Sequence, residues 1–306
     1  MSLLQRKVQM DVISNSETSS FQTCERRHYY NFGLRLQPKR MSTSLSKGIA
    51  GHEVLAIYYE SRKSGQSHTA AVHTAISHLD RLMTRDLTEN LGMNIDWLTE
   101  LRVRLVDYFN WCEDQDYFRI VEVETTYRVD LPTRPMQYAM RLDLLVEMTA
   151  GPQIGNLVII DHKFVYDFYG ESELSMNAQL PKYIGIVTAN GHLVRSAILN
   201  QIRTRVNKKK PMEIADKFRR ELIVPNVQEI RTIFAEELMV AERIAELRAL
   251  PVDEWEQQVT RTMNNMTCKT CPFVSLCKTE LSGQDTRLMR EMDYEPITYG
   301  YAEAES

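Results

Sequence analysis

The sequence has no apolar run long enough to cross a membrane, and residues 1–7 lack the apolar core of a secretory signal. Positive charge is not in excess either: the formal net charge is -4, so any surface for nucleic acid must be a local patch. Internal repeats and low-complexity linkers are also missing. With 43% hydrophobic and 25% charged residues among 306, we expect a folded cytoplasmic protein of one large or two modest domains.

Cysteine is scarce and unevenly spread. The chain has five cysteines, an odd number, and three of them, Cys268, Cys271 and Cys277, fall within ten residues. This pattern is a poor disulfide framework and a good metal framework, with Cys24 as the natural fourth ligand. Cys112 lies on the apolar side of a predicted helix and is expected in the core. Four thiolates suit zinc or an iron–sulfur cluster, although zinc sites more often have two paired CxxC motifs.

Four consecutive apolar residues, 157–160, predict a buried strand that ends in Asp161-His162-Lys163. Side chains alternate along a strand, so Asp161 and Lys163 should share one face and His162 should point to the other. A buried acid and base are costly unless they are paired or hold a metal. Taken alone, this common triplet is better explained by a salt bridge at a strand end than by a metal site.

A second acid occurs in a similar setting. Residues 138–147 predict another strand that contains Asp143, and Gly155 and Asn156 predict a turn before the next strand. A hairpin of these strands would bring Asp143 close to Asp161. Two such carboxylates repel each other unless a divalent cation lies between them, and Mg²⁺ commonly binds one or two carboxylates together with phosphate oxygens.

The expected class is α/β, with a central mixed sheet flanked by helices and a helical insertion at about 53–117. Gln179 and Tyr183, four residues apart on a predicted helix, share a face, which is either functional or an ordinary helix surface. Pro181 lies between them and is expected to interrupt that helix. Helices are expected over 14–33, 44–64, 67–89, 95–116, 173–189, 211–221 and 226–261, and strands over 118–130, 136–148, 157–164 and 193–205.

In this order, the motifs make the chain similar to a known family. It resembles RecB-like nucleases of the PD-(D/E)XK superfamily, which have a restriction-endonuclease-like core. The likeness is to the iron–sulfur branch, which includes the nuclease module of the AddB helicase-nuclease, CRISPR-adaptation nucleases and single-strand DNA exonucleases. The matching segments are residues 19–30 around Cys24, Gly48-x3-His52, Asp143, Asp161-x-Lys163, Gln179-x3-Tyr183 and Cys268-x2-Cys271-x5-Cys277.

The resemblance implies a role for each matching residue. Asp143, Asp161, the backbone carbonyl of His162 and, as an additional ligand, His52 would hold Mg²⁺ or Mn²⁺. Lys163 would orient or activate the attacking water and stabilise charge on the phosphate. Gln179 and Tyr183 would position Lys163 or the strand being cut. Cys24, Cys268, Cys271 and Cys277 would bind a structural 4Fe-4S cluster that joins the N-terminal helix to the C-terminal region.

The domain expected from this likeness is one nuclease domain over 1–281, with a catalytic core at about 118–205, a cluster loop at 268–277 and an acidic, loosely held tail at 282–306. The sequence departs from the family pattern at Met140, where glycine is frequent, and at Leu142, where the superfamily's name has proline. Pro181 within the Gln-x3-Tyr motif is also unusual. None of these departures removes a ligand.

The implied activity is that of a metal-dependent exonuclease on single-stranded DNA or duplex ends, in replication, recombination or repair. The compact size also leads us to expect that the protein is phage-encoded. An endonuclease on branched or looped DNA, or a non-catalytic scaffold that binds DNA ends, are the alternatives. Partners would be DNA and replication or recombination proteins, and a homo-oligomer is compatible with the sequence. Expected DNA contacts are Arg26, Arg27, Lys47 and the basic loop 203–210, with Tyr29 and Tyr30 available for stacking on bases.

Overall fold

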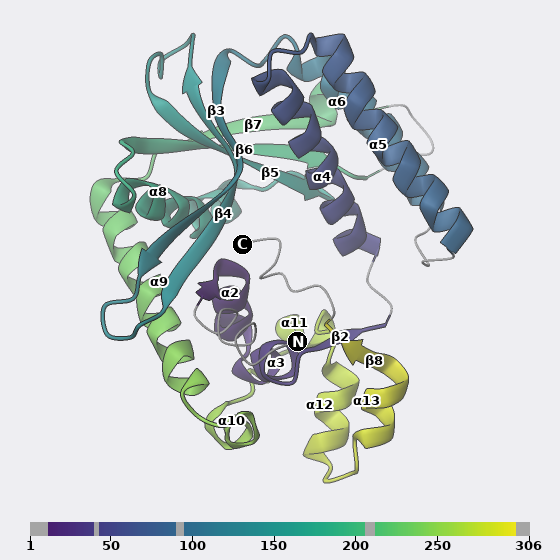
Figure 1. The fold of residues 1–306 in the computed structure, drawn as a ribbon, viewed down its shortest axis with the longest axis vertical. Coiled ribbons are helices and arrows are strands. Elements are labelled where there is room, and N and C mark those ends of the chain that lie inside the picture. Colours follow the sequence, from purple (N-terminus) through teal and green to yellow (C-terminus); the bar gives the residue numbers. More distant parts are fainter. Residues whose placement is uncertain (1–11, 40–42, 90–94, 206–211, 298–306) are drawn as a thin grey trace. The chain divides into compact units, whose positions relative to one another are not determined.

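The computed structural model describes residues 12–39, 43–89, 95–205 and 212–297 (Figure 1). The chain divides into two compact units. Unit 1 comprises residues 1–40, 126–140 and 232–306, and unit 2 comprises 41–125 and 141–231. None of the helices in the described ranges combines the length and the apolar character that a transmembrane span requires.

Unit 2 contains a mixed sheet flanked by helices, as the sequence predicts. In this sheet β4 pairs antiparallel with β5, β5 runs parallel to β6, and β6 pairs antiparallel with β7. The strands β3 and β4 also contribute residues to unit 1. The elements are α4 (Thr43–Lys63), α5 (His68–Glu89), α6 (Ile95–Cys112), β3 (Phe118–Asp130), β4 (Gln137–Met148), β5 (Leu157–Val165), α7 (Glu171–Ser175), α8 (Gln179–Ala189), β6 (Val194–Arg203), a 3₁₀ turn (Ile214–Asp216) and β7 (Phe218–Ile223).

The core of unit 2 lies between the sheet and the three helices α4, α5 and α6, which pack against one another (Figure 1). Leu144, Val146, Val158 and Ile160 enter this core and are at most 1% exposed. They are alternate residues of β4 and β5, so the odd-numbered residues between them face the opposite side of the sheet. The apolar pattern of two strands therefore determines which way Asp143 and its odd-numbered neighbours point.

Unit 1 is built mainly from helices at the two ends of the described chain. Ser14 caps the first helix by accepting a hydrogen bond from the backbone N–H of Glu17. The β1 strand runs parallel to the first residues of β4, and β2 pairs antiparallel with β8 (Figure 1). The elements are β1 (Val12–Ser14), α2 (Asn15–Thr23), α3 (Glu25–His28), a π-helical turn (Tyr29–Gly33), β2 (Leu36–Pro38), α9 (Val227–Arg248, mostly in this unit), α10 (Val252–Gln258), α11 (Asn265–Lys269), α12 (Val274–Leu281), α13 (Arg287–Asp293) and β8 (Tyr294–Pro296).

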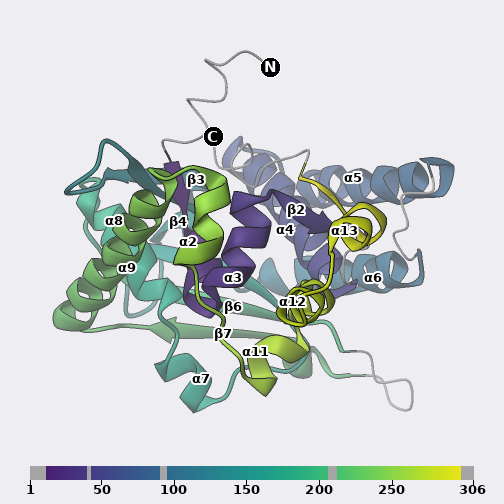
Figure 2. The same ribbon diagram turned by 90° about the horizontal axis from the view of Figure 1, so that it is seen from below.

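Several elements differ from the sequence predictions. The helix expected over 211–221 is wrong, because Phe218–Ile223 forms β7 and its backbone pairs with β6. The helix expected over 14–33 breaks at Cys24, whose φ of -169° is extended. The cysteine segment contains the helices α11 and α12, which follow each other closely (Figure 2), rather than a compact loop.

The C-terminal segment was expected to be loosely held, yet residues 287–296 form α13 and β8, and β8 pairs with β2. Pro181 does not interrupt a helix. It lies in the first turn of α8, where its missing N–H has no helical partner to lose, and α7 ends before it.

Candidate active site

Asp143 and Asp161 meet where the pairing of β4 and β5 ends. The last antiparallel pair on this side is Leu144 with Ile160, so the next position in the register sets Asp143 opposite Asp161. At this point a side chain replaces the backbone as acceptor: the backbone N–H of His162 donates to Oδ2 of Asp143 at 2.6 Å. The hairpin predicted from the sequence is confirmed, and it brings the two acids to one place on one face of the sheet.

Lys163 completes this group from the same strand. Its Nζ lies 3.0 Å from both carboxylate oxygens of Asp161, whose side chain is only 2% exposed. His162 points to the other face, where its ring stacks on Tyr59 with centroids 5.4 Å apart and its Nδ1 lies 2.6 Å from the amide nitrogen of Asn200. The alternation predicted for the triplet is confirmed. The role predicted for the carbonyl of His162 stays a prediction.

His52 reaches the site from α4. Its Nδ1 lies 3.4 Å from Oδ1 of Asp143, and its ring packs edge-on against Phe164. Phe164 also contacts Gly51 so closely that a Cβ built there would lie 2.2 Å from the ring, whereas a Cβ at Gly48 would meet nothing within 4 Å. Gly51 therefore lets α4 approach β5, although the family motif marks Gly48.

Glu124 is a site residue that the sequence reasoning missed. One ligand atom from each of His52, Glu124 and Asp143 lies within 4.8 Å of the others. Glu124 has φ +49°, a conformation that is rare for a residue with a side chain, and its carboxylate lies 3.0 Å from Nε of Arg141. A glutamate within an alternating strand gives no sequence signal for such a kink, so only the folded structure reveals it.

Burial and crowding of charge push the pKa values of these acids apart. Burial raises the pKa of Asp161, and the neighbouring Asp143 raises it further, more than Lys163 offsets. Burial would also raise the pKa of Asp143, but His52, His162 and Lys163 hold it well below its usual range. Burial and Asp143 raise the pKa of Glu124 to about 7. Three acids therefore share a space in which they cannot all ionise at little cost.

A divalent cation fits this group. It would let the three carboxyl groups ionise together, because its two charges would offset theirs. Carboxylate oxygens suit Mg²⁺ and Mn²⁺, and one imidazole is compatible with Mn²⁺. Oδ2 of Asp161 is buried, and its one polar contact in the described part of the chain is the ion pair with Lys163 at 3.0 Å, which leaves room for a further positive partner. The donor set and the uncompensated acids thus match a metal site better than they match a simple salt bridge.

Gln179 and Tyr183 lie on α8, as expected from their spacing. The side-chain amide of Gln179 donates to the hydroxyl of Tyr183 at 2.7 Å, and Tyr183 is 5% exposed. The pair therefore acts as a unit in which Gln179 fixes the hydroxyl. Its part in positioning Lys163 stays a prediction.

Comparison with protein-family models matches residues 12–278 to the PD-(D/E)XK nuclease superfamily. The chain belongs to the PD-(D/E)XK nuclease superfamily. The match spans most of the chain and includes every residue of the group just described. No curated protein matches this superfamily member.

Two solved structures are similar in outline to this PD-(D/E)XK protein. The structure of SSO0001 has 16% sequence identity and a TM-score of 0.34, covering 66% of this chain and 84% of that chain. A protein from Eubacterium rectale, described as a candidate exonuclease, has 11% identity and a TM-score of 0.48, covering 87% of this chain and 90% of that chain. Likenesses this weak carry no argument about function, which rests on the family and the site.

The remaining four predicted ligands of this PD-(D/E)XK protein lie in unit 1. Cys24, Cys268, Cys271 and Cys277 all line one cavity of about 100 Å³, whereas Cys112 is buried in the core of unit 2 as predicted. Among the described residues, no three of these sulfurs lie within 4.8 Å of one another. A zinc ion with four thiolates would hold its sulfurs about 3.8 Å apart, given Zn–S bonds of about 2.3 Å.

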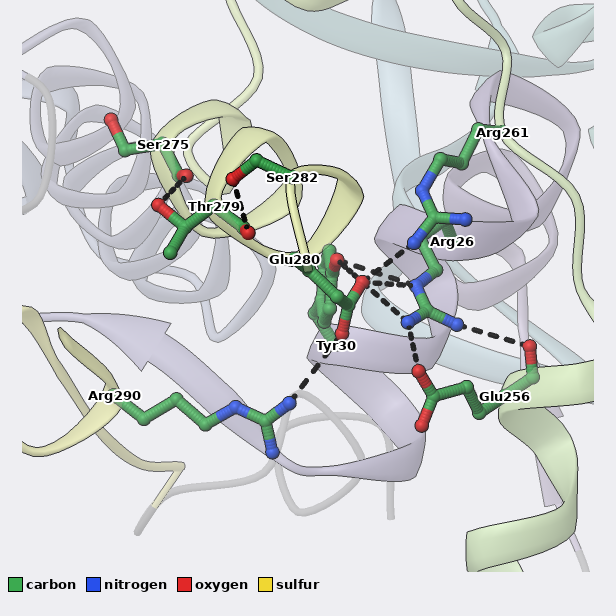
Figure 3. A network of polar contacts seen from close by, with 9 residues as sticks. All are labelled: Arg26, Tyr30, Glu256, Arg261, Ser275, Thr279, Glu280, Ser282 and Arg290. Carbon is green, nitrogen blue, oxygen red and sulfur yellow. Dashed lines mark hydrogen bonds and ion pairs between the residues drawn. The ribbon is translucent and has the colours of Figure 1, made fainter. Parts of the chain in front are cut away.

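Arg26, expected to contact DNA, is instead part of an ion-pair network (Figure 3). It lines the same cavity as these cysteines. Its side chain is 1% exposed and binds the carboxylates of Glu256 and Glu280. Tyr30 donates to Glu280 at 2.5 Å and is 1% exposed, and Tyr29 is 4% exposed. Neither tyrosine can stack on a base, so this part of the predicted DNA surface is wrong. The side chain of Lys47 and residues 206–210 lie outside the described residues.

Proposed function

We propose that this PD-(D/E)XK protein is a metal-dependent deoxyribonuclease, an exonuclease that acts on single-stranded DNA or duplex ends. The observation that carries the proposal is the meeting of Asp143 with Asp161 and Lys163 at the point where β4 and β5 separate. Metal-dependent hydrolysis of a phosphodiester uses a cation to bind the phosphate and an amine or base to orient the attacking water. The site offers side chains suited to both tasks.

Each residue of the site has a proposed task. Asp143, Asp161 and Glu124, with His52, would hold Mg²⁺ or Mn²⁺. When bound, the ion supplies Lewis-acid polarisation of the phosphate and charge neutralisation. Lys163, held by Asp161, would orient the water and stabilise the negative charge that develops on the phosphate oxygens.

We also propose that Cys24, Cys268, Cys271 and Cys277 bind a 4Fe-4S cluster. What supports this proposal is that all four cysteines line one cavity, since four thiolates are the ligand set of such a cluster. The cluster would tie α2 and α3 to α11 and α12 within unit 1, a structural task. The nuclease would act in the cytoplasm during replication, recombination or repair, alone or as a subunit, including in a phage-infected host.

The test is a cleavage assay on protein purified without oxygen. End-labelled linear and circular single strands are incubated with Mn²⁺, for the wild type and for Asp161→Asn, Lys163→Ala and Glu147→Gln. Glu147 is a partly exposed carboxylate on the same strand as Asp143 and is the matched control. The site variants should lose about 100-fold or more of the activity, and the control should keep it.

The products decide between the forms of the proposal. Release of mononucleotides or short fragments from linear DNA only, lost in both site variants, supports the exonuclease. Cutting of circles would replace it by an endonuclease with the same centre. Activity that survives in Asp161→Asn would refute the centre itself, and DNA binding by a wild type that never cuts would make the protein a scaffold.

A further inference from the structure

The segment that follows β5 carries aromatic side chains that lie against arginines from the two neighbouring strands. The guanidinium carbon of Arg203 is 4.1 Å from the ring centroid of Phe168, and that of Arg219 is 5.8 Å from the same ring. Arg205 lies 5.7 Å from the ring of Tyr166. These five residues, 166, 168, 203, 205 and 219, are called here the aromatic–arginine surface.

The register of the sheet joins this surface to the catalytic lysine. Lys163 on β5 pairs with Gln201 on β6, and Gln201 pairs with Arg219 on β7. Paired residues of adjacent strands face the same side, and strands lie about 4.8 Å apart, so the backbone of Arg219 is about 10 Å from that of Lys163. Val165 pairs with Arg203 one row further on. Arg203 and Arg219 therefore occupy the same face as Lys163 and Asp161.

Hydrogen bonds from β6 fix the aromatic segment in place. The side-chain oxygen of Gln201, which is fully buried, accepts from the backbone N–H of Tyr169 at 2.8 Å. Thr204 donates through both its N–H and its hydroxyl to the carbonyl of Val165. The segment between these anchors is consequently held beside the strand end, with its rings at a defined distance from the site.

Positive charge on this surface exceeds what the neighbouring acids offset. Arg203 and Arg205 share a single carboxylate, that of Asp167, at 3.5 Å each. Burial and the proximity of Arg203 lower the pKa of Arg104, despite Asp107 nearby, and its Nη1 is buried without a hydrogen-bond partner among the described residues. Arg219 has its own partner in Glu221. A ligand with several negative charges would relieve this crowding.

Exposure separates this surface from ordinary structural packing. Tyr166 is 68% exposed, and the side chains of Arg205 and Arg219 are 51% and 43% exposed. A ring that served only the core would be covered. Here one face of the ring carries a cation and much of the ring remains open to a planar partner, the arrangement that proteins use to stack on bases.

We propose that the aromatic–arginine surface binds the unpaired DNA strand next to the phosphate that is cut, with Tyr166 and Phe168 against bases and the arginines against phosphates. This inference rests on the proposed nuclease function. Residues 166–168 follow Lys163 by only three to five positions, so their contacts fall close to the scissile phosphate.

The experiment measures binding without cleavage, so that it is independent of activity. Fluorescence anisotropy of a labelled oligothymidylate is recorded in EDTA for the wild type, Tyr166→Ala, Phe168→Ala and the double variant Arg205→Gln/Arg219→Gln. Matched controls are Tyr117→Ala and Arg119→Gln, whose side chains in unit 2 are 57% and 64% exposed. Thermal unfolding of each variant checks that the fold is intact, and Tyr166→Phe and Phe168→Tyr test rescue by a ring.

Each aromatic-to-alanine change should weaken binding about fivefold or more, the ring-for-ring changes should restore it, and the controls should bind as the wild type does. The arginine double variant should lower the slope of log affinity against log salt by about 1.4, which corresponds to two phosphate contacts on a single strand. A blunt duplex should compete poorly, because its bases are already stacked.

Two results would overturn the inference. The first is that the alanine variants bind the oligonucleotide as tightly as the wild type does. The second is that polyglutamate displaces the oligonucleotide as well as DNA of equal charge does, because an acidic peptide would use the arginines but not the rings. Both could occur in a protein that cuts DNA, leaving the proposed nuclease function standing. Conversely, a wild type that binds through this surface but never cuts would remove the nuclease function and keep the binding site.

Discussion

Glu124 has a strained backbone inside a strand, and its side chain is aimed at His52 and Asp143. A residue other than glycine in this left-handed region costs of order 1–3 kcal/mol, and such strain is retained where the surroundings impose it. This strained conformation directs the carboxylate of Glu124 into the site. The backbone strain and the positions of the candidate ligand atoms thus point to the same residue, which neither composition nor motif spacing could have identified.

Glu124→Gln should weaken Mn²⁺ binding about tenfold or more, because one carboxylate ligand becomes a neutral amide. Glu124→Gly should weaken it equally, yet be about 1 kcal/mol more stable than Glu124→Gln, because glycine adopts a positive φ at little cost. Titration calorimetry with Mn²⁺ and urea unfolding measure the two effects. Glu147→Gln is the control, and unchanged Mn²⁺ affinity in Glu124→Gln would exclude this residue as a ligand.

Glu17 offers a separate test of buried charge, in unit 1. Its carboxylate binds Arg248 at 2.5 Å and lies 2.9 Å from Nε2 of His28. Burial would raise the pKa of Glu17, but Arg248 and His28 lower it more, so the folded value lies below the usual 4.5. The ionised form therefore stabilises the fold above about pH 4.5, and this contribution is lost as the pH falls through the lowered folded value.

Glu17→Gln should lower the free energy of unfolding at pH 7 by about 3–5 kcal/mol, because it removes a buried carboxylate that pairs with both Arg248 and His28. The difference from the wild type should shrink as the pH falls below 4.5, because Glu17 is protonated first in the unfolded chain and then, at its lowered pKa, in the folded one. Urea unfolding at several pH values measures both. The control Glu246→Gln removes a half-exposed partner of Arg243 and should cost less than about 1 kcal/mol. If this control cost as much stability as Glu17→Gln, the argument from burial would be contradicted.

At the scale of elements, the helices and strands with strong periodicity are the ones the sequence predicts well. The buried runs of β4 and β5 gave the hairpin, and with it the pairing of Asp143 and Asp161. The wrong prediction of a helix over 211–221 has a physical cause. The β7 strand spans only six residues, and its pairing with β6 outweighs the local preference of its sequence. Cys24 breaks a helix that its neighbours would continue, so it faces the cavity that it shares with the C-terminal cysteines.

The contact between α4 and β5 supplies the element-scale prediction. Gly51→Ala should cost about 1–3 kcal/mol and displace His52 from Asp143, because the added methyl group would overlap the ring of Phe164. Gly48→Ala, three residues earlier in the same helix, faces open space and should add about 0.5–1 kcal/mol of stability through helix propensity. Thermal unfolding and Mn²⁺ titration of both variants check this pair. Equal stability of the two would show that Phe164 can move aside without cost.

At the scale of the whole molecule, the two proposed inorganic sites belong to different compact units: the acids and His52 to unit 2, the four cysteines to unit 1. The sequence reasoning could propose the ligands of each site from its motifs, apart from Glu124, because ligand types and spacing are local signals. It could not divide the chain, because unit 1 gathers the two ends of the chain and one central segment. Such a unit closes only when residues more than two hundred positions apart come together.

A cluster bound by the four cysteines would hold these distant segments together and so would contribute strongly to stability. A crosslink between Cys24 and Cys268 restricts a loop so long that, by analogy with disulfides, it stabilises the folded chain by about 5 kcal/mol. Protein purified without oxygen should be brown and contain iron and acid-labile sulfide. Cys271→Ser should be colourless and unfold at lower urea, whereas Cys112→Ala, which empties a core position of unit 2, should lose stability but keep the iron. A colourless wild type that contains zinc would reject the cluster, and it would leave the acids of unit 2 and their predicted Mn²⁺ affinity untouched.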